Sequence, residues 1–148
     1  MNLERLQKQL EIDEGKKLDV YLDHLGYPTV GIGHLIVDSD PAEISCLKVG
    51  DKITEEQCTE LFQKDVAIAL ADCKVIFEEW DSYPDTVQEV LVNMLFNLGR
   101  PRFLGFKNMI AAIYDKDWAE ASRQMADSKW ARQVGARASR LISRMENV

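Results

Sequence analysis

Residues 12–34 read IDEGKKLDVYLDHLGYPTVGIGH, and this stretch decides the fold of the N-terminal third of the chain. Before it, apolar residues at helical spacing predict a helix over residues 2–13, which Gly15 can end because glycine reaches the left-handed conformation at low cost. From Lys17 to Asp23 the pattern changes to the alternation typical of a strand. A turn then leads back into TVGIGH, so the stretch predicts a helix end followed by an antiparallel hairpin.

One face of the predicted hairpin carries very small side chains. Asp23, Thr29, Gly31 and Gly33 share it, and apolar residues alternate with them on the other face. Glycine weakens a strand by roughly 0.5–1 kcal/mol through backbone entropy, but it lets another molecule approach the backbone closely. From the residues alone, the floor of a cleft and a tight bend or β-bulge both explain this face.

Beyond the hairpin we expect a loop over residues 38–53, with a short third strand near 35–37 or near Ile53. TEEQ at 54–57 predicts a capping box that opens a long helix. Four further helices are expected at residues 86–98, 106–114, 118–127 and 137–146, with breaks at 99–101, 115–117 and 135. A small antiparallel sheet combined with segregated helices is an α+β fold.

The length of 148 residues fits one domain, within which we expect two lobes. One lobe, residues 13–60, contains the sheet, and the other combines residues 61–148 with helix 1–12. The long helix predicted from residue 54 onward would join a small β-sheet lobe to a mainly helical lobe.

The net charge of -7 is unevenly distributed along the chain. Residues 1–99 carry 20 acidic and 8 basic side chains, whereas residues 100–148 carry 5 acidic and 10 basic ones. The overall acidity argues against a protein that coats nucleic acid. The basic C-terminal third is either an ordinary solvated surface or a face for an anionic ligand.

Neither a bilayer-spanning apolar run of ~20 residues nor an apolar signal core is found in the sequence. Cys46, Cys58 and Cys73 are odd in number and lack metal-type spacing, so we expect reduced thiols that pack as small apolar residues. These features predict a protein made in the cytoplasm, without a leader or a membrane anchor.

Glu14 and Asp23 are candidates for acid–base chemistry. Cleavage of a glycosidic bond needs an acid that protonates the leaving oxygen and a carboxylate on the other side of the sugar ring. Glu14, at a helix end among apolar residues, suits the acid, because a desolvated site raises a carboxyl pKa. Asp23, in a polar turn, would stay ionised, and the hydroxyl of Thr29 could hold a water beside it. Most such acids are solvated surface residues, so residue types alone leave both interpretations open.

The spacing of these residues resembles the catalytic signature of phage-type lysozymes of the T-even kind: Glu, eight residues, Asp or Cys, five residues, Thr. Eight residues separate Glu14 from Asp23 here, and five separate Asp23 from Thr29. Later segments resemble the same family: ITEEQCTELFQKDV (53–66), NMLFNLG (93–99), GFKNMI (105–110), SKWARQ (128–133) and GARASRLI (135–142). The middle loop is shorter than in the family, and the C-terminus lacks the family's extra segment.

The resemblance implies a muramidase that cuts the β-1,4 bond between N-acetylmuramic acid and N-acetylglucosamine in peptidoglycan, with no cofactor and no metal. Glu14 matches the general acid, Asp23 the carboxylate that activates water, and Thr29 its hydroxyl partner. A directly placed water implies inversion at the anomeric carbon, for which the two carboxyl groups are expected to lie roughly 6.5–9.5 Å apart.

The resemblance also implies substrate-binding residues, which share positions along the expected cleft: Leu35, Gly31, Gly33, Phe96, Asn97, Gln124 and Arg137. Met109 replaces a serine at another such position. Arg137 matches an arginine that pairs with the catalytic glutamate. His34 and Asp65 match a histidine–aspartate pair that we interpret as structural, and we expect Trp118 and Trp130 to be core residues.

The biological role implied by the resemblance is that of a phage or prophage endolysin. We expect a monomer that accumulates in the host cytoplasm and acts on peptidoglycan glycan strands in the periplasm after a holin opens the membrane. One alternative is a lytic transglycosylase, which needs only the acid; another is a catalytically inactive peptidoglycan-binding module. Asp23 and Thr29 favour the hydrolase, because both serve a water molecule.

Overall fold

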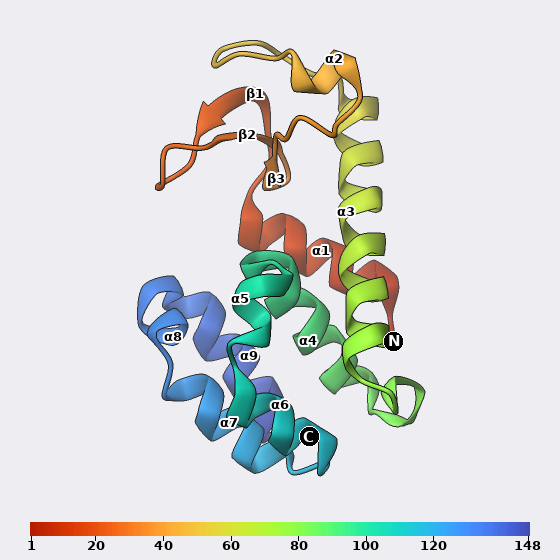
Figure 1. Ribbon diagram of the computed structural model, residues 1–148, viewed down its shortest axis with the longest axis vertical. Coiled ribbons are helices and arrows are strands. Elements are labelled where there is room, and N and C mark those ends of the chain that lie inside the picture. Colours follow the sequence, from red (N-terminus) through yellow and green to blue (C-terminus); the bar gives the residue numbers. More distant parts are fainter. The chain divides into compact units, whose positions relative to one another are not determined.

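The N-terminal stretch folds as a helix followed by a small antiparallel sheet in the computed structural model, which describes residues 1–148 (Figure 1). The elements are α1 (Leu3–Glu14), β1 (Lys17–Leu22), β2 (Pro28–Gly31) and β3 (His34–Leu35), and the strand order is β1-β2-β3. Thr29 pairs with Tyr21 on one side and with Leu35 on the other. The predicted helix end, hairpin and short third strand are confirmed, and with them the α+β class.

The alternation predicted through TVGIGH is wrong after Gly31. Strand β2 ends at Gly31, and both Gly31 and Gly33 have a positive φ, of 68° and 66°. Residues with side chains rarely adopt this left-handed region, whereas glycine does so readily. The two glycines therefore make the bend between β2 and β3 instead of lying on an open strand face, and Gly31 is itself buried.

The loop before the long helix contains a short helix that the sequence does not predict, α2 (Ala42–Ser45). At the end of this loop the N–H of Ile53 donates to the carbonyl of Leu18 at 2.8 Å, so the chain returns to β1. Helix α3 (Glu55–Ile76) opens with the predicted capping box. The Thr54 N–H donates to Gln57 Oε1 at 2.9 Å, and the Gln57 N–H donates to Thr54 Oγ1 at 3.1 Å.

The rest of the chain is helical: η1 (Trp80–Ser82), α4 (Asp85–Leu98), α5 (Arg100–Leu104), α6 (Lys107–Tyr114), α7 (Trp118–Ala126), α8 (Lys129–Val134) and α9 (Ala136–Glu146). The four predicted helices are confirmed as α4, α6, α7 and α9. No bounds were predicted for the short helices α5 and α8. Pro101, taken as part of a break, lies in the first turn of α5, where its missing N–H has no helical partner to lose.

The chain divides into two compact units, residues 7–67 and residues 1–6 with 68–148. We call them the sheet unit and the helical unit. Buried apolar residues of the sheet unit include Leu10, Val20, Val30, Ile44 and Ile53. Those of the helical unit include Phe77, Leu91, Met94, Phe103, Ile113 and Leu141.

Smaller predictions about single residues have mixed outcomes. Cys58, Cys73 and Trp130 are buried as expected, but Cys46 is exposed, because it follows the short helix α2 on the surface.

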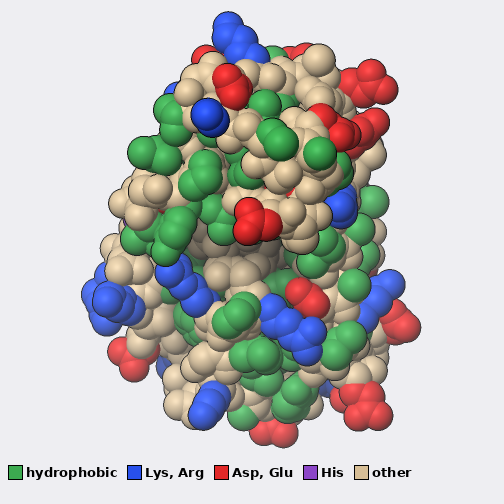
Figure 2. All heavy atoms as spheres, turned by 45° about the horizontal axis from the view of Figure 1, so that its top comes forward, with side chains coloured by type: hydrophobic (Ala, Val, Ile, Leu, Met, Phe, Trp, Pro, Cys, Tyr) green, Lys and Arg blue, Asp and Glu red, His purple; other side chains and the backbone are tan.

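No helix of the structure combines the length and the apolar composition needed to cross a membrane. On the face that Figure 2 shows, acidic and basic side chains are interspersed, and several of opposite charge lie next to one another.

Candidate active site

Asp23 follows β1 directly and closes the hairpin turn. The backbone N–H groups of Leu25 and Tyr27 both donate to Asp23 Oδ1 at 2.9 Å, and the Asp23 N–H donates to the Tyr27 carbonyl at 2.9 Å. The hydrogen bond from the Tyr27 N–H, helped by that of Leu25, lowers the pKa of Asp23 below its ordinary value. Asp23 is thus a fixed, ionised carboxylate, and the hydrogen bonds from Leu25 and Tyr27 both go to its Oδ1.

Thr29 is tied to the same turn through its side chain. Its hydroxyl donates to the carbonyl of Tyr27 at 3.1 Å, and the residue is only 5% exposed. A hydroxyl has one hydrogen to donate and two lone pairs, so Oγ1 remains an acceptor. The backbone of Tyr27 therefore holds Asp23 and Thr29 together, each with an oxygen that can still accept a hydrogen bond.

Glu14 is the last residue of α1 and lies against the bend of the hairpin. Gly15 ends the helix with φ at 73°. A Cβ atom added at Gly33 would lie 2.7 Å from Glu14 Oε2, a distance that real Cβ atoms do not tolerate. Gly33 thus serves both the bend and the close approach of the Glu14 carboxylate. The group that comes near this glycine is a side chain of the same chain.

Gly31 has a comparable but less severe constraint. A Cβ atom there would lie 3.3 Å from Cys58 Sγ, so this glycine is pressed against the start of α3. The bend that carries Gly31 and Gly33 is therefore held between α1 and α3 within the sheet unit.

His34 joins three segments of the sheet unit. Its Nδ1 lies 2.7 Å from Asp65 Oδ2 on α3, and its Nε2 lies 2.9 Å from Asp40 Oδ2 in the following loop. Burial lowers the pKa of His34, but the hydrogen bonds to Asp65 and Asp40 outweigh it and the pKa is raised. The predicted pairing with Asp65 is confirmed, whereas Asp40 was missed.

Tyr21 was not among the residues predicted to belong to the site. It pairs with Thr29 across β1 and β2, so the two side chains project from the same face of the sheet. The alternation in β1 could have indicated it, because Tyr21 lies two residues before Asp23 and therefore on the same face of the strand. Leu35, on the other side of Thr29, is 44% exposed, as a residue that contacts a ligand would be.

The remaining predicted substrate-binding residues belong to the helical unit. Phe96 and Asn97 lie on α4, Gln124 on α7 and Arg137 on α9. Asn97 Oδ1 accepts a hydrogen bond from Trp130 Nε1 at 2.7 Å, which leaves its amide hydrogens as the groups that can contact a ligand. The guanidinium of Arg137 is buried and donates to Asn93 Oδ1 at 2.9 and 3.0 Å.

The helical unit contains a cavity of about 540 Å³. It is lined by Arg102, Gly105, Phe106, Lys107, Asn108, Met109, Gln124, Asp127 and Ser128. Two cations and two side-chain amides are among these residues, so the cavity offers several hydrogen-bond donors. Of the predicted substrate-binding residues, it brings in Gln124.

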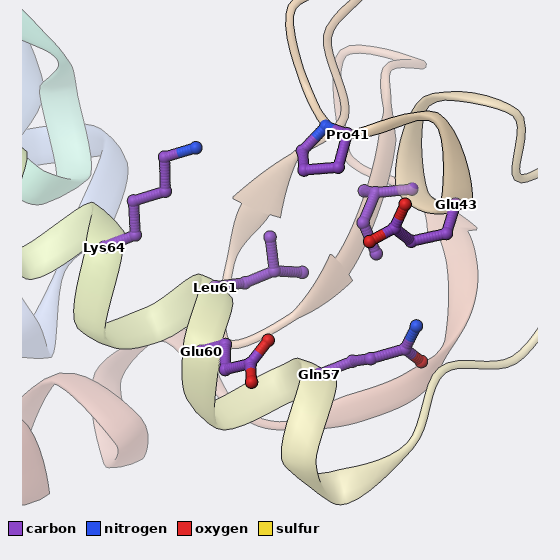
Figure 3. A pocket seen from close by; sticks show the side chains of 7 residues that line it. Pro41, Glu43, Gln57, Glu60, Leu61 and Lys64 are labelled. Carbon is purple, nitrogen blue, oxygen red and sulfur yellow. The ribbon is translucent and has the colours of Figure 1, made fainter.

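A second, smaller pocket of about 110 Å³ lies in the sheet unit (Figure 3). Pro41, Glu43 and Ile44 line one side, and Gln57, Glu60, Leu61 and Lys64 of α3 line the other. None of the predicted site residues contributes to it. The candidate active site is therefore the hairpin with Glu14, not this pocket.

Comparison with known proteins places the chain among lysozymes. The phage lysozyme family model matches residues 11–147. Probable T4-type lysozyme 1 of Dictyostelium discoideum is 32% identical over 161 residues, covering 95% of this chain and 93% of the relative. The endolysin of Salmonella phage P22 is 28% identical over 100 residues, covering 66% of this chain and 62% of the relative.

A third relative is much longer than this chain. The pre-baseplate central spike protein Gp5 of Enterobacteria phage T4 is 36% identical over 152 residues. The match covers 92% of this chain but 26% of the spike protein. The similarity is thus to one part of that protein.

Proposed function

The chain belongs to the phage lysozyme family, and from this premise we propose that it is an endolysin with inverting muramidase activity. Membership makes it a lysozyme, a glycoside hydrolase of peptidoglycan. The proposed reaction is hydrolysis of the β-1,4 bond between N-acetylmuramic acid and N-acetylglucosamine. The observation that carries it is the single turn that holds Asp23 and Thr29, with Glu14 packed against the adjoining bend.

Glu14 is the proposed general acid. It would protonate the glycosidic oxygen as the bond to the leaving sugar breaks, which such a residue can accelerate by about 10²–10⁴-fold. The close packing of its carboxylate on Gly33 supports this role, because a catalytic proton donor must be held in one position.

Asp23 and Thr29 are proposed to bind the attacking water. One water hydrogen would be donated to Asp23 Oδ2 and the other to Thr29 Oγ1, because Asp23 Oδ1 and the Thr29 hydroxyl hydrogen are already engaged with the turn backbone. The lone pairs of the water would then face the anomeric carbon. Attack from the side opposite Glu14 inverts that carbon.

This arrangement favours hydrolysis over the two alternatives. A lytic transglycosylase has no need for a bound water, so a fixed acceptor pair such as Asp23 and Thr29 would serve no purpose in it. An inactive binding module would not need the close approach of the Glu14 carboxylate to Gly33.

Glycan strands are proposed to contact both units. In the sheet unit, the exposed side chain of Leu35 and the backbone at Gly33 would contact sugar. Gly31 is buried against Cys58, so its proposed role is to shape the bend. In the helical unit we assign contacts with sugar to Phe96, Asn97, Gln124 and Arg137. The cavity beside Gln124 supports a contact in that region.

The proposed biological role is lysis of a bacterial host. The enzyme would act as a monomer, accumulate in the host cytoplasm and reach the cell wall after a holin opens the membrane. The similarity to an endolysin supports this role.

Digestion of purified peptidoglycan tests the proposal. We expect the wild type to release muropeptides with reducing N-acetylmuramic acid ends, and Glu14→Gln and Asp23→Asn to lose at least about 100-fold in rate. Mass spectrometry of the products separates the alternatives. Anhydro products would support a transglycosylase, and equal activity of wild type and Glu14→Gln would exclude Glu14 as the acid.

A further inference from the structure

The phenol of Tyr21 lies among the proposed catalytic groups without a partner of its own. Tyr21 pairs with Thr29 across the sheet and is half-buried. Its hydroxyl makes no hydrogen bond within the protein and is not enclosed by it, unlike the buried hydroxyl of Tyr83. A polar group that remains open to solvent beside a reaction centre can bind a ligand without first breaking a protein contact.

The ring of Tyr21 is held in place by Lys17 from the same strand. Lys17 Nζ lies 4.9 Å from the ring centroid, within the range of a cation–π interaction. Lys17 pairs with Gly31, and Tyr21 pairs with Thr29. The contact between Lys17 and Tyr21 therefore covers the part of β1 that lies opposite β2. The phenol is thus positioned by the fold before any substrate binds.

Both proposed catalytic carboxylates act on this phenol. Burial, then the negative charges of Glu14 and of Asp23, raise the pKa of Tyr21 above its ordinary value. The hydroxyl therefore stays protonated at neutral pH. It is a neutral hydrogen-bond donor beside the Asp23 carboxylate and the Thr29 oxygen, both of which can accept a hydrogen bond.

We propose that Tyr21 is a further substrate-positioning residue, whose hydroxyl donates a hydrogen bond to an oxygen of the sugar that lies between Glu14 and Asp23. This inference rests on the proposed muramidase function. A sugar presents hydroxyl, ring and acetamido oxygens as acceptors. The proton of Glu14 is assigned to the glycosidic oxygen and ionised Asp23 has no proton to donate, so the site needs another donor for these oxygens. The attacking water has its two hydrogens assigned to Asp23 and Thr29, which leaves the phenol for the sugar.

Tyr21→Phe removes the hydroxyl and keeps the ring over which Lys17 lies. We expect kcat/KM on soluble peptidoglycan fragments to fall about tenfold, which corresponds to about 1.4 kcal/mol of transition-state stabilisation, with an unchanged melting temperature. Tyr83→Phe is the matched control, because it removes a phenol hydroxyl that also has no partner but lies buried in the helical unit. We expect it to retain wild-type kcat/KM.

A measurement of ligand affinity distinguishes a contact between Tyr21 and sugar from a general effect of the substitution on activity. In the inactive Glu14→Gln background, the dissociation constant of a muropeptide tetrasaccharide should rise about fivefold or more when Tyr21→Phe is added. Lys17→Met should raise it by a smaller factor, because the hydroxyl remains but its ring is less constrained.

Two results would overturn the inference. One is an active wild type, an inactive Glu14→Gln and a Tyr21→Phe variant with unchanged kcat/KM and unchanged tetrasaccharide affinity. The other is a fall in the kcat/KM of Tyr21→Phe that is accompanied by a lower melting temperature and disappears when the assay is run at a temperature where the variant is fully folded. An inactive wild type would instead contradict the proposed function itself.

Discussion

At the scale of single residues, Tyr27 explains how the two water-binding groups come to lie together. Its N–H donates to Asp23 Oδ1, and its carbonyl accepts hydrogen bonds from the Asp23 N–H and the Thr29 hydroxyl. The five-residue spacing from Asp23 to Thr29 is thus the length of one tight turn that folds back on itself. A changed spacing would separate two oxygens that the proposed mechanism needs on one water.

Thr29→Val tests the hydroxyl at nearly constant shape. We expect kcat to fall about 100-fold, because the water loses one of its two acceptors. The carbonyl of Tyr27 keeps its bond from the Asp23 N–H, so the free energy of unfolding should fall by only about 1 kcal/mol. Thr29→Ser restores the acceptor and should recover most of the activity; equal activities of the Val and Ser variants would argue against the water role.

Gly33→Ala should impair both folding and catalysis. The left-handed φ of 66° costs an alanine about 1–2 kcal/mol, and the new Cβ would also displace the Glu14 carboxylate. Gly50→Ala is the matched control, because Gly50 has φ at 92° and nothing within 4 Å of its added Cβ. Urea denaturation should show a cost in both variants, whereas only Gly33→Ala should lose activity at a temperature where both are folded.

At the scale of elements, the sequence predicts those helices that carry a long periodic pattern and a recognisable start. The α3 capping box is readable because Thr54 and Gln57 satisfy each other's N–H groups locally. Helices α2, α5 and α8 have four to six residues, too few for an apolar period. The bend at Gly31 and Gly33 was misread as a strand because period two cannot reveal a positive φ.

The contacts of His34 join β3, the loop at Asp40 and helix α3, and they make the sheet unit sensitive to pH. A pKa raised on folding means that the charged histidine stabilises the fold fully below the unfolded value of about 6.5. This stabilisation is lost as the pH rises through the folded-state pKa. The difference in unfolding free energy between wild type and His34→Gln should therefore shrink at alkaline pH.

Asp40→Asn provides the comparison for this effect. It removes one of the two carboxylates that raise the His34 pKa. The pH at which the stabilisation by charged His34 is lost should therefore be lower than in the wild type. A wild-type advantage over His34→Gln that stays constant or grows with pH would contradict the assignment.

At the scale of the whole molecule, Glu89 connects distant parts of the chain within the helical unit. Its carboxylate is fully buried, accepts from Arg5 Nε at 2.7 Å and from an Arg144 terminal nitrogen at 3.2 Å, and so joins the N-terminal residues, α4 and α9. Burial raises the pKa of Glu89, but the hydrogen bonds of Arg5 and Arg144 outweigh it and the pKa is lowered.

Glu89→Gln should cost about 1–3 kcal/mol of unfolding free energy near pH 7, because the charge-assisted hydrogen bonds from Arg5 and Arg144 lose their acceptor charge. A lowered pKa gives stability that is present above the unfolded value of about 4.5 and lost as the pH falls through the folded value. The cost of the substitution should thus diminish in acid. A cost that is the same at pH 3 and pH 7 would argue against an ionised Glu89.

The parts of the candidate site that the sequence predicts are those fixed by chain spacing. Glu14, Asp23 and Thr29 were found because a helix end and one turn set their distances along the chain. Tyr21 and Asp40 were missed, since their importance depends on pairing across strands and on a loop conformation that no local pattern records. For the same reason, the partner of the Thr29 hydroxyl, a backbone carbonyl, could not be read from residue types.

The most direct test of the central claim is the anomeric configuration of the newly formed reducing end, followed by proton NMR during the first minutes of digestion of a soluble peptidoglycan fragment. A water held by Asp23 and Thr29 attacks opposite Glu14, so the initial product from the β-linked substrate should be the α anomer. An initial β anomer, or an anhydro sugar without a reducing end, would contradict the account.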